Sequence, residues 1–360
     1  MTVLGCSSPT SSSGSSADAA PTTEGAKQAA AYLADFSANP TSIVLDEPLP
    51  ARPPAGKSVI TLTVPLPVAK RLSDAEEAAA KKLGWDYSSI AAGATPASAV
   101  AAFEAALSRK PDAIAFSGYP ASLFADQIRK AKAAGIAVVS NATGDGPVDG
   151  VVTDVRGTEE AKLYGRRAAA YFVVHSGAKG KAGIFNINAY PILTAFVDGF
   201  QEAVRQWCPD CGTEVLNQQL TDPGTTTPNN VVSYLQRHPD AKWVVFSNGD
   251  ISQGVSPAIR TAGLTGINIM GEVPTEANLA NLASKAEAAW VADPVDILGW
   301  RVIDILARHF VGADTAKAAK ALLPGQVITA DNVTHIVVDH GFYVGVEGYQ
   351  AQFARLWKTD

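Results

Sequence analysis

The sequence contains neither a long apolar run nor a basic run, and each absence excludes a class of partner. No stretch reaches 18 consecutive apolar residues, so no segment is expected to span a bilayer. No basic run is longer than Lys-Arg or Arg-Arg, and the formal net charge of the 360 residues is −6. Such a chain lacks the basic surface that binds nucleic acid or anionic membranes. We therefore expect neither partner.

The motifs of the common enzyme classes are also absent. The sequence has no G-x-S-x-G, H-E-x-x-H or Walker motif, and its five histidines share no metal-binding spacing. A sugar hydrolase or isomerase using Asp250, Glu272 and Asp293 is an alternative, but nothing fixes two carboxylates at a catalytic separation. We expect no catalytic residues, no cofactor and no metal site.

Cysteine is scarce, with three residues in the chain. Cys208 and Cys211 form a C-x-x-C pair, but a zinc site would need two further ligands at metal spacing. A thioredoxin-like motif would begin a helix, whereas this pair follows one. We therefore expect a small disulfide, which fits an oxidising compartment outside the cytoplasm.

The third cysteine, Cys6, follows Val3-Leu4-Gly5, which resembles a bacterial lipobox that is cut just before the cysteine. A Ser/Thr/Ala/Pro tract continues to Thr23 and has the composition of a flexible tether. A complete signal peptide would need a charged start and a longer apolar region, so a stray cysteine is the alternative. We expect Cys6 to be lipidated and residues 1–23 to tether the protein to a membrane. We expect no other contact with the membrane.

Most of the sequence alternates between strand patterns and helix patterns. Residues 112–117 form a short apolar run, and Leu123, Ile128, Ala131 and Ala134 then recur at helical spacing. Gly135 ends that helix, and residues 136–140 form a second apolar run. Strand, helix and strand within ~30 residues predict a βαβ unit with parallel strands. Ligands of such sheets bind beyond the carboxyl ends of the strands.

The same alternation begins at Lys57, after a short helix and a Pro-rich strap in residues 24–56. The first strand is expected over 58–64, and Ser73 with Glu76 has the pattern of a capping box that opens the next helix. Near Arg156 to Thr158 the chain is expected to cross into a second lobe of the same architecture.

The residues directly after the expected strands indicate where a ligand would bind. They are Pro65-Leu66-Pro67, Gly118-Tyr119-Pro120, Asn141, Asn188-Ala189-Tyr190, Asn248-Gly249-Asp250, Glu272 and Asp293. The set is rich in Asn, Asp and Tyr and lacks Lys, Arg, His and Cys. Amides and carboxylates bond vicinal hydroxyls, and aromatic rings cover the C–H face of a sugar. The set predicts a neutral polyhydroxy ligand, since a phosphate or carboxylate would call for Arg, Lys or a Gly-rich nest.

Each of these residues also has a structural alternative. The alternatives are turn residues for Asn141 and Asn248, helix caps for Asp250 and Asp293, a solvated rim for Glu272, hinge packing for Tyr119 and Tyr190, and core packing for Trp290.

From Lys57 to about Phe310 the chain resembles type I periplasmic solute-binding proteins of the ribose-binding class, which serve ABC transporters. The resemblance is carried by AGIAVVSN (134–141), DGFQEAV (198–204), VVFSNGD (244–250), TAG (261–263) and EAAWVADPVDILGW (287–300). It implies an α/β fold with two Rossmann-like lobes, parallel sheets and a three-strand hinge. The first lobe would take 57–155 plus 293–323, and the second 156–292 plus 324–360.

The resemblance also implies a function: a monomeric, extracytoplasmic protein that captures a sugar or polyol for an ABC transporter permease. A ligand-sensing domain of the same fold that signals to a membrane partner is the alternative. The expected ligand-binding residues are Tyr119, Asn141, Asn188, Tyr190, Thr194, Asn248, Asp250, Glu272, Trp290 and Asp293. Thr194 stands where the family often has Arg, Val273 where it often has Asp, and the first strand lacks the usual Asn-Pro-Phe-aromatic segment. The sequence therefore predicts the class of ligand, a sugar or polyol, but does not identify which one.

Overall fold

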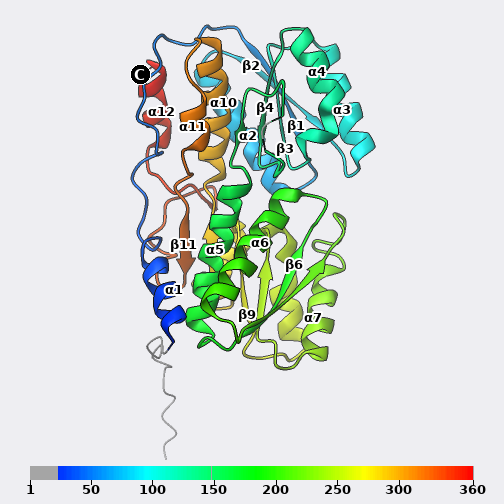
Figure 1. Cartoon of the computed structure of the whole chain (residues 1–360), viewed down its shortest axis with the longest axis vertical. Coiled ribbons are helices and arrows are strands. Elements are labelled where there is room, and N and C mark those ends of the chain that lie inside the picture. Colours follow the sequence, from blue (N-terminus) through cyan, green and yellow to red (C-terminus); the bar gives the residue numbers. More distant parts are fainter. Residues whose placement is uncertain (1–22, 147, 360) are drawn as a thin grey trace, which may run out of the picture.

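The computed structural model describes residues 23–146 and 148–359, which form two lobes stacked along the long axis of the molecule (Figure 1). The first lobe has a parallel sheet of strand order β2-β1-β3-β4-β5. Its strands are β1 (Ser58–Thr63), β2 (Asp86–Ala91), β3 (Ala113–Ser117), β4 (Ala137–Asn141) and β5 (Asp154–Val155). Its helices are α2 (Pro67–Lys82), α3 (Pro96–Ser108), η1 (Ala121–Phe124), α4 (Ala125–Ala133), α10 (Val295–Phe310) and α11 (Ala316–Lys320).

The second lobe has a sheet of order β11-β10-β9-β8-β6-β7, in which β11 alone runs antiparallel to its neighbour. Its strands are β6 (Lys181–Asn186), β7 (Gly212–Asn217), β8 (Trp243–Phe246), β9 (Asn268–Glu272), β10 (Ala289–Ala292) and β11 (Gln326–Thr329). Its helices are α5 (Thr158–His175), α6 (Pro191–Trp207), α7 (Thr227–Arg237), η2 (Gly249–Ser252), α8 (Val255–Thr261) and α9 (Glu276–Ala283).

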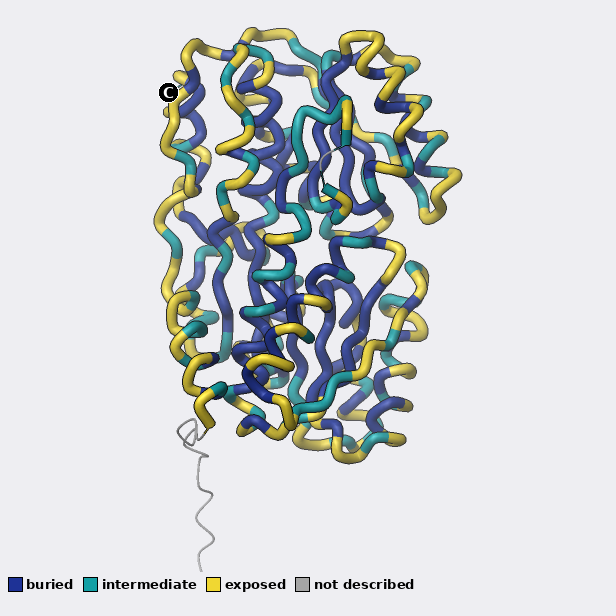
Figure 2. Tube along the Cα trace, viewed as in Figure 1, coloured by how far each residue is buried: buried dark blue, intermediate teal, exposed yellow. Residues whose placement is uncertain are grey.

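The central strands are the apolar runs of the sequence, and helices cover both faces of each sheet. Every residue of β3, β4, β8 and β10 is buried, as expected of parallel strands between two helical layers. Figure 2 shows these buried strands inside each lobe and exposed residues on the outer helices. The α/β fold with two parallel-sheet lobes, predicted from the sequence, is confirmed.

The chain passes between the lobes after β5, after β10 and between α11 and β11. The segments at the two ends of the chain also run from one lobe to the other. Helix α1 (Glu24–Ala34) packs on α5 of the second lobe. The strap that follows lies on the first lobe, where the Arg301 guanidinium donates to the Ile43 carbonyl at 2.7 Å. The lobes are therefore joined along one side of the molecule (Figure 1).

The end of the chain lies partly outside the lobe that the sequence predicted for it. After β11 and the hairpin of β12 (Val338–Asp339) and β13 (Phe342–Tyr343), helix α12 (Tyr349–Trp357) packs on α10 of the first lobe. The rings of Trp300 and Trp357 stack there with centroids 5.3 Å apart. The assignment of all of residues 324–360 to the second lobe therefore needs correction, because the apolar face of α12 is buried against α10.

Helix α2 also begins earlier than predicted. It starts at Pro67, so Ser73 and Glu76 are buried within it and form no capping box. Proline is favoured at a first helical position because its missing N–H would have no helical partner. The residue before it, Leu66, provides no side-chain cap. The amino end of α2 therefore depends on a partner from elsewhere, described below.

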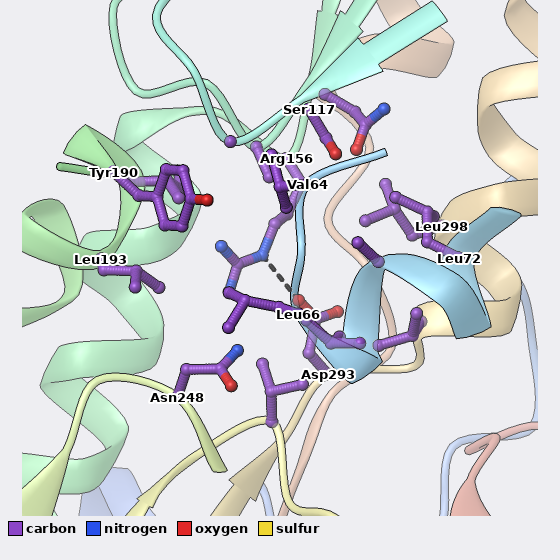
Figure 3. Close-up of a pocket in the computed structure, with 18 of the residues that line it drawn as sticks. Val64, Leu66, Leu72, Ser117, Arg156, Tyr190, Leu193, Asn248, Asp293 and Leu298 are labelled. Atoms are coloured by element: carbon purple, nitrogen blue, oxygen red, sulfur yellow. Dashed lines mark hydrogen bonds and ion pairs between the residues drawn. The ribbon is translucent and has the colours of Figure 1, made fainter. Parts of the chain in front are cut away.

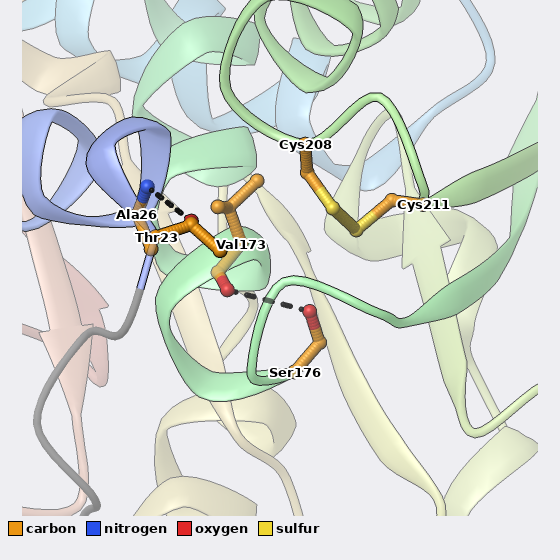
Figure 4. Close-up of a disulfide and its surroundings, with 6 residues drawn as sticks. All are labelled: Thr23, Ala26, Val173, Ser176, Cys208 and Cys211. Atoms are coloured by element: carbon orange, nitrogen blue, oxygen red, sulfur yellow. Dashed lines mark hydrogen bonds between the residues drawn. A yellow bond between two sulfur atoms is a disulfide. The ribbon is translucent and has the colours of Figure 1, made fainter.

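Cys208 and Cys211 form a disulfide with a Cα–Cα distance of 5.3 Å between α6 and β7, which confirms the predicted pairing (Figure 4). Cys6 lies outside the described residues. In the part of the chain that the structure describes, no helix is long and apolar enough to cross a membrane.

Candidate ligand-binding site

A cavity of about 90 Å³ lies between the two lobes, at the carboxyl ends of their strands (Figure 3). The first lobe contributes Ser117 and Asn141 from the ends of β3 and β4. The second lobe contributes Asn248 and Glu272 from the ends of β8 and β9. Arg156 and Asp293 come from two of the segments that cross between the lobes. The parallel topology thus brings six polar side chains from distant parts of the sequence to one cavity.

Arg156 forms the centre of a buried ion cluster. Its Nε donates to Asp293 Oδ2 at 2.6 Å, and its Nη2 donates to Glu272 Oε2 at 2.8 Å. The three side chains are at most 4% exposed. Burial raises the pKa of Glu272 to about 8, although Arg156 opposes the shift. The cluster therefore carries little net charge near neutral pH.

Four buried polar atoms at this cavity have no hydrogen-bond partner in the structure. They are Asn141 Oδ1, Tyr190 Oη, Glu272 Oε1 and Asp293 Oδ1. Buried polar groups in proteins are nearly always paired, because an unpaired one loses its hydration without replacement. Two of the four atoms, Asn141 Oδ1 and Asp293 Oδ1, can accept a hydrogen bond, and the Tyr190 hydroxyl can donate or accept one. A ligand that fills this cavity should therefore offer groups that both donate and accept hydrogen bonds.

The backbone around the cavity is strained. Ala142, Arg156 and Val273 all line it, and all have φ between 50° and 56°, in the left-handed region that residues with a Cβ rarely adopt. Such outliers cost of order 1–3 kcal/mol each and collect at ligand sites. Three of them at one cavity point independently to a functional site.

The rest of the cavity wall is aliphatic. The first lobe contributes side chains from the end of β1, the start of α2 and the start of α10, and the second lobe adds residues of α6 together with Val273. They are Val64, Leu66, Val68, Ala69, Leu72, Ala142, Ile192, Leu193, Val273, Val295 and Leu298. Tyr190 is the one aromatic side chain among the described residues that line the cavity.

Asp250 lies next to the cavity and bonds across the gap between the lobes. Its Oδ2 accepts a hydrogen bond from the Val68 backbone N–H of α2, 3.1 Å away. Its own backbone N–H donates to Asn248 Oδ1 at 2.9 Å, which fixes the start of η2. Burial raises the pKa of the Asp250 carboxyl to about 6. Asp250 thus supplies the cap that α2 lacks, from the opposite lobe.

Five of the ten residues expected to bind a ligand line this cavity: Asn141, Tyr190, Asn248, Glu272 and Asp293. Glu272 is fully buried, so it is no solvated rim residue. Asp250 lines a smaller adjoining pocket together with Asp293.

The other four expected residues do not line the cavity. Asn188 is exposed, and Trp290 is completely buried in the core, where its Nε1 donates to Glu287 at 2.6 Å. Thr194 lies beside Asn186, whose amide donates to its hydroxyl at 3.3 Å. Tyr119 packs behind Tyr190 with ring centroids 5.5 Å apart.

Arg156 was not predicted from the sequence, although it directly follows a strand, β5, as the predicted residues do. The positions read from the sequence included no Arg, whereas Arg156 lines the cavity. The guanidinium was overlooked because the strand before it is two residues long and gives little pattern. Ser117, the last residue of β3, was missed in the same way, because the search began after the strand.

Comparisons with known proteins agree with this geometry. A family profile described as a periplasmic binding protein domain matches residues 67–314. No curated protein sequence matches the chain.

Several solved structures share the fold at low sequence identity. A solute-binding protein from Agrobacterium vitis, bound with alpha-D-tagatopyranose, is 22% identical with a TM-score of 0.69, over 80% of this chain and 99% of that one. A 5-methylthioribose transporter solute-binding protein from Thermotoga lettingae is 15% identical with a TM-score of 0.71, over 88% and 100% of the two chains. One from Mycobacterium smegmatis with bound glycerol is 19% identical with a TM-score of 0.68, over 81% and 99%.

The family match covers most of the chain, and the described lobes, crossings and inter-lobe cavity are those of this fold. The family is one of binding proteins, in agreement with the expectation that the chain is not an enzyme. The chain belongs to the periplasmic binding protein family.

Proposed function

We propose that this protein captures one small, neutral sugar or polyol between its lobes, outside the cytoplasm, for import through the permease of an ABC transporter. The observation that carries the proposal is the set of unpaired buried oxygens on Asn141, Glu272 and Asp293. A hydroxyl group both donates and accepts, so it can pair with each of these oxygens. The similar structures whose ligands are tagatopyranose, 5-methylthioribose and glycerol support this ligand class.

The charges of the cavity favour a neutral ligand over an anion. Arg156 is the one cationic side chain among the described residues lining the cavity, and both of its acidic partners lie within 2.8 Å of it. An anionic ligand would meet no uncompensated cation, because Arg156 is already paired with Asp293 and Glu272, and burying an unpaired anion is costly. Sugar phosphates and sugar acids are therefore disfavoured.

The mechanism is closure of two lobes around the ligand. The polar side chains come from both lobes, so a ligand that touches Asn141 on one side and Asn248 on the other favours the closed form. An analogue that lacks a required hydroxyl leaves an oxygen buried and unpaired, which gives the site its specificity. The permease would recognise the closed arrangement.

Attachment to the membrane through a lipid on Cys6 belongs to the same proposal. Its support is the Val3-Leu4-Gly5-Cys6 pattern and the Ser/Thr/Ala/Pro tract up to Thr23. The protein expressed in a bacterium behind a lipoprotein signal peptide should partition into detergent, and a Cys6→Ser variant should stay in the aqueous phase. Equal partitioning of the two proteins would contradict the lipid anchor.

The ligand proposal is tested by isothermal titration calorimetry of the purified protein. The compounds should include neutral monosaccharides and polyols, together with their phosphates and carboxylates. We expect at least one neutral compound to bind with a Kd of about 10 μM or tighter, equivalent to roughly 7 kcal/mol, and its anionic forms to bind much more weakly. Binding of anionic compounds alone would contradict the proposal.

A further inference from the structure

The composition of the cavity wall narrows the ligand class. This inference rests on the proposed function. Besides its polar side chains, the wall contains a group of aliphatic side chains around the starts of α2 and α10, which includes Leu66, Leu72 and Leu298. In Figure 3, Leu66 lies beside Arg156 and Asp293, and Leu72 and Leu298 lie together on the other side of the start of α2.

A fully hydroxylated sugar is a poor match for this wall. Leu66, Ala69, Leu72 and Leu298 are each at most 8% exposed, so a hydroxyl placed against them would leave water without gaining a partner. Nor is there a pair of aromatic rings to hold both C–H faces of a sugar ring, because Tyr190 is the single aromatic residue among the described lining residues. An aliphatic surface instead gains free energy when it contacts hydrocarbon.

We propose that the ligand is a deoxy or alkyl-substituted sugar or polyol: its hydroxyls meet Asn141, Glu272 and Asp293, and its hydrocarbon part meets the aliphatic side chains of the cavity wall, Leu66, Leu72 and Leu298 among them. The cavity of about 90 Å³ is well below the ~300–1,000 Å³ typical of sites for drug-sized ligands. The ligand is therefore small, and its apolar substituent is of the size of a methyl group.

Matched pairs of compounds test this inference on the unmodified protein. The pairs are D-ribose with 5-deoxy-D-ribose, D-galactose with D-fucose, and erythritol with 2-C-methylerythritol, each titrated by calorimetry. A single group in an apolar pocket changes affinity by about 10–200-fold. We expect the more apolar member to bind at least tenfold tighter in at least one pair, and the reverse preference in none.

The outcomes separate this inference from the proposed function. If the more hydroxylated members bind as tightly or more tightly in every pair, the inference is overturned while the proposed function stands. If neutral sugars and polyols, including the wider panel above, do not bind at all, the proposed function fails and the inference with it.

A substitution in the aliphatic wall gives a second test. Leu66→Asn places an amide against the ligand edge and should reduce the preference for the apolar member at least fivefold. Leu322→Asn is the matched control, because Leu322 is 41% exposed and is not among the cavity-lining residues. Equal preferences in the two folded variants would overturn the role of the wall. If Leu66→Asn does not fold, as judged by circular dichroism, the paired titrations of the unmodified protein still decide the matter.

Discussion

The Asp250 carboxylate and the Val68 backbone N–H form a hydrogen bond of 3.1 Å between the two lobes. Val68 lies in the first turn of α2, whose amino end has no side-chain cap from its own lobe. An acidic group at a helix amino terminus satisfies an unpaired N–H and interacts favourably with the helix dipole. In the proposed closure of the lobes, this contact would complete the cap of α2 and so favour the closed form.

Removing this contact should weaken ligand binding. Asp250→Ala deletes the acceptor, and loss of a charged hydrogen bond costs about 1.5–3 kcal/mol, so the Kd should rise roughly 10- to 100-fold. Asp250→Asn keeps an oxygen acceptor and should have a smaller effect. Asp149→Ala is the control, since Asp149 is exposed on the first lobe and pairs with Lys132. Unchanged calorimetric affinity in Asp250→Ala would show that the contact does not assist closure.

Arg156 should be important for stability as well as for the site. Arg156→Leu leaves Glu272 and Asp293 buried without their cation, and breaking a buried pair in this way costs about 3–5 kcal/mol. Arg129→Leu removes an exposed ion pair with Asp126 and should cost about 0–1 kcal/mol. Urea unfolding measures both. Similar losses in the two variants would contradict the central position of Arg156.

Stability should fall as the pH rises from about 5 to about 8. Burial raises the pKa of Glu272 to about 8, of Glu160 to about 7 and of Asp250 to about 6. Since these carboxyls bind protons more tightly in the folded state than in the unfolded chain, the free energy of unfolding decreases as they ionise.

Urea unfolding at several pH values measures this dependence. The Glu272→Gln variant, which cannot ionise at that position, should show a flatter profile than the unmodified protein. A free energy of unfolding that increases between pH 5 and pH 8 would contradict the assignment of raised pKa values.

Asn141 should affect binding more than folding. Its Oδ1 is unpaired at the cavity, while its Nδ2 donates to the Phe116 carbonyl at 3.3 Å. Asn141→Ala should raise the Kd at least tenfold and reduce stability by about 1 kcal/mol. The control Asn230→Ala changes an exposed asparagine on α7 and should leave the calorimetric Kd unchanged. Binding that survives the loss of Asn141 would remove it from the site.

Trp290 should affect folding and not binding, in contrast to the expectation from sequence. Trp290→Phe removes the hydrogen bond to Glu287 and part of a fully buried ring, and we expect a loss of about 1–3 kcal/mol. The folded variant should bind ligand as the unmodified protein does. A large increase in Kd without loss of stability would instead place Trp290 in the ligand contacts.

The alternation of strands and helices could be predicted because buried parallel strands appear in the sequence as short apolar runs bounded by turn residues. The positions just after those runs led to Asn141, Asn248, Glu272 and Asp293 in one cavity. The topology alone places such residues together, so no knowledge of their contacts was needed.

Other features depend on contacts between distant segments and leave no local pattern. The start of α2 was mistaken because Ser73 and Glu76 match a capping box, whereas the actual cap comes from Asp250, 182 residues along the chain from Val68. Trp290 was ambiguous because strand residues alternate between faces, and only its packing within the second lobe shows that it lies in the core.

A crystal structure of the protein with its bound ligand tests the central claim most directly. We expect the ligand between the lobes, with its hydroxyls within hydrogen-bond distance of Asn141 Oδ1 on the first lobe, of Asn248 on the second, and of Asp293 Oδ1 at the crossing between them. A ligand bound to the outer surface, or held by one lobe without contact to the other, would contradict the account.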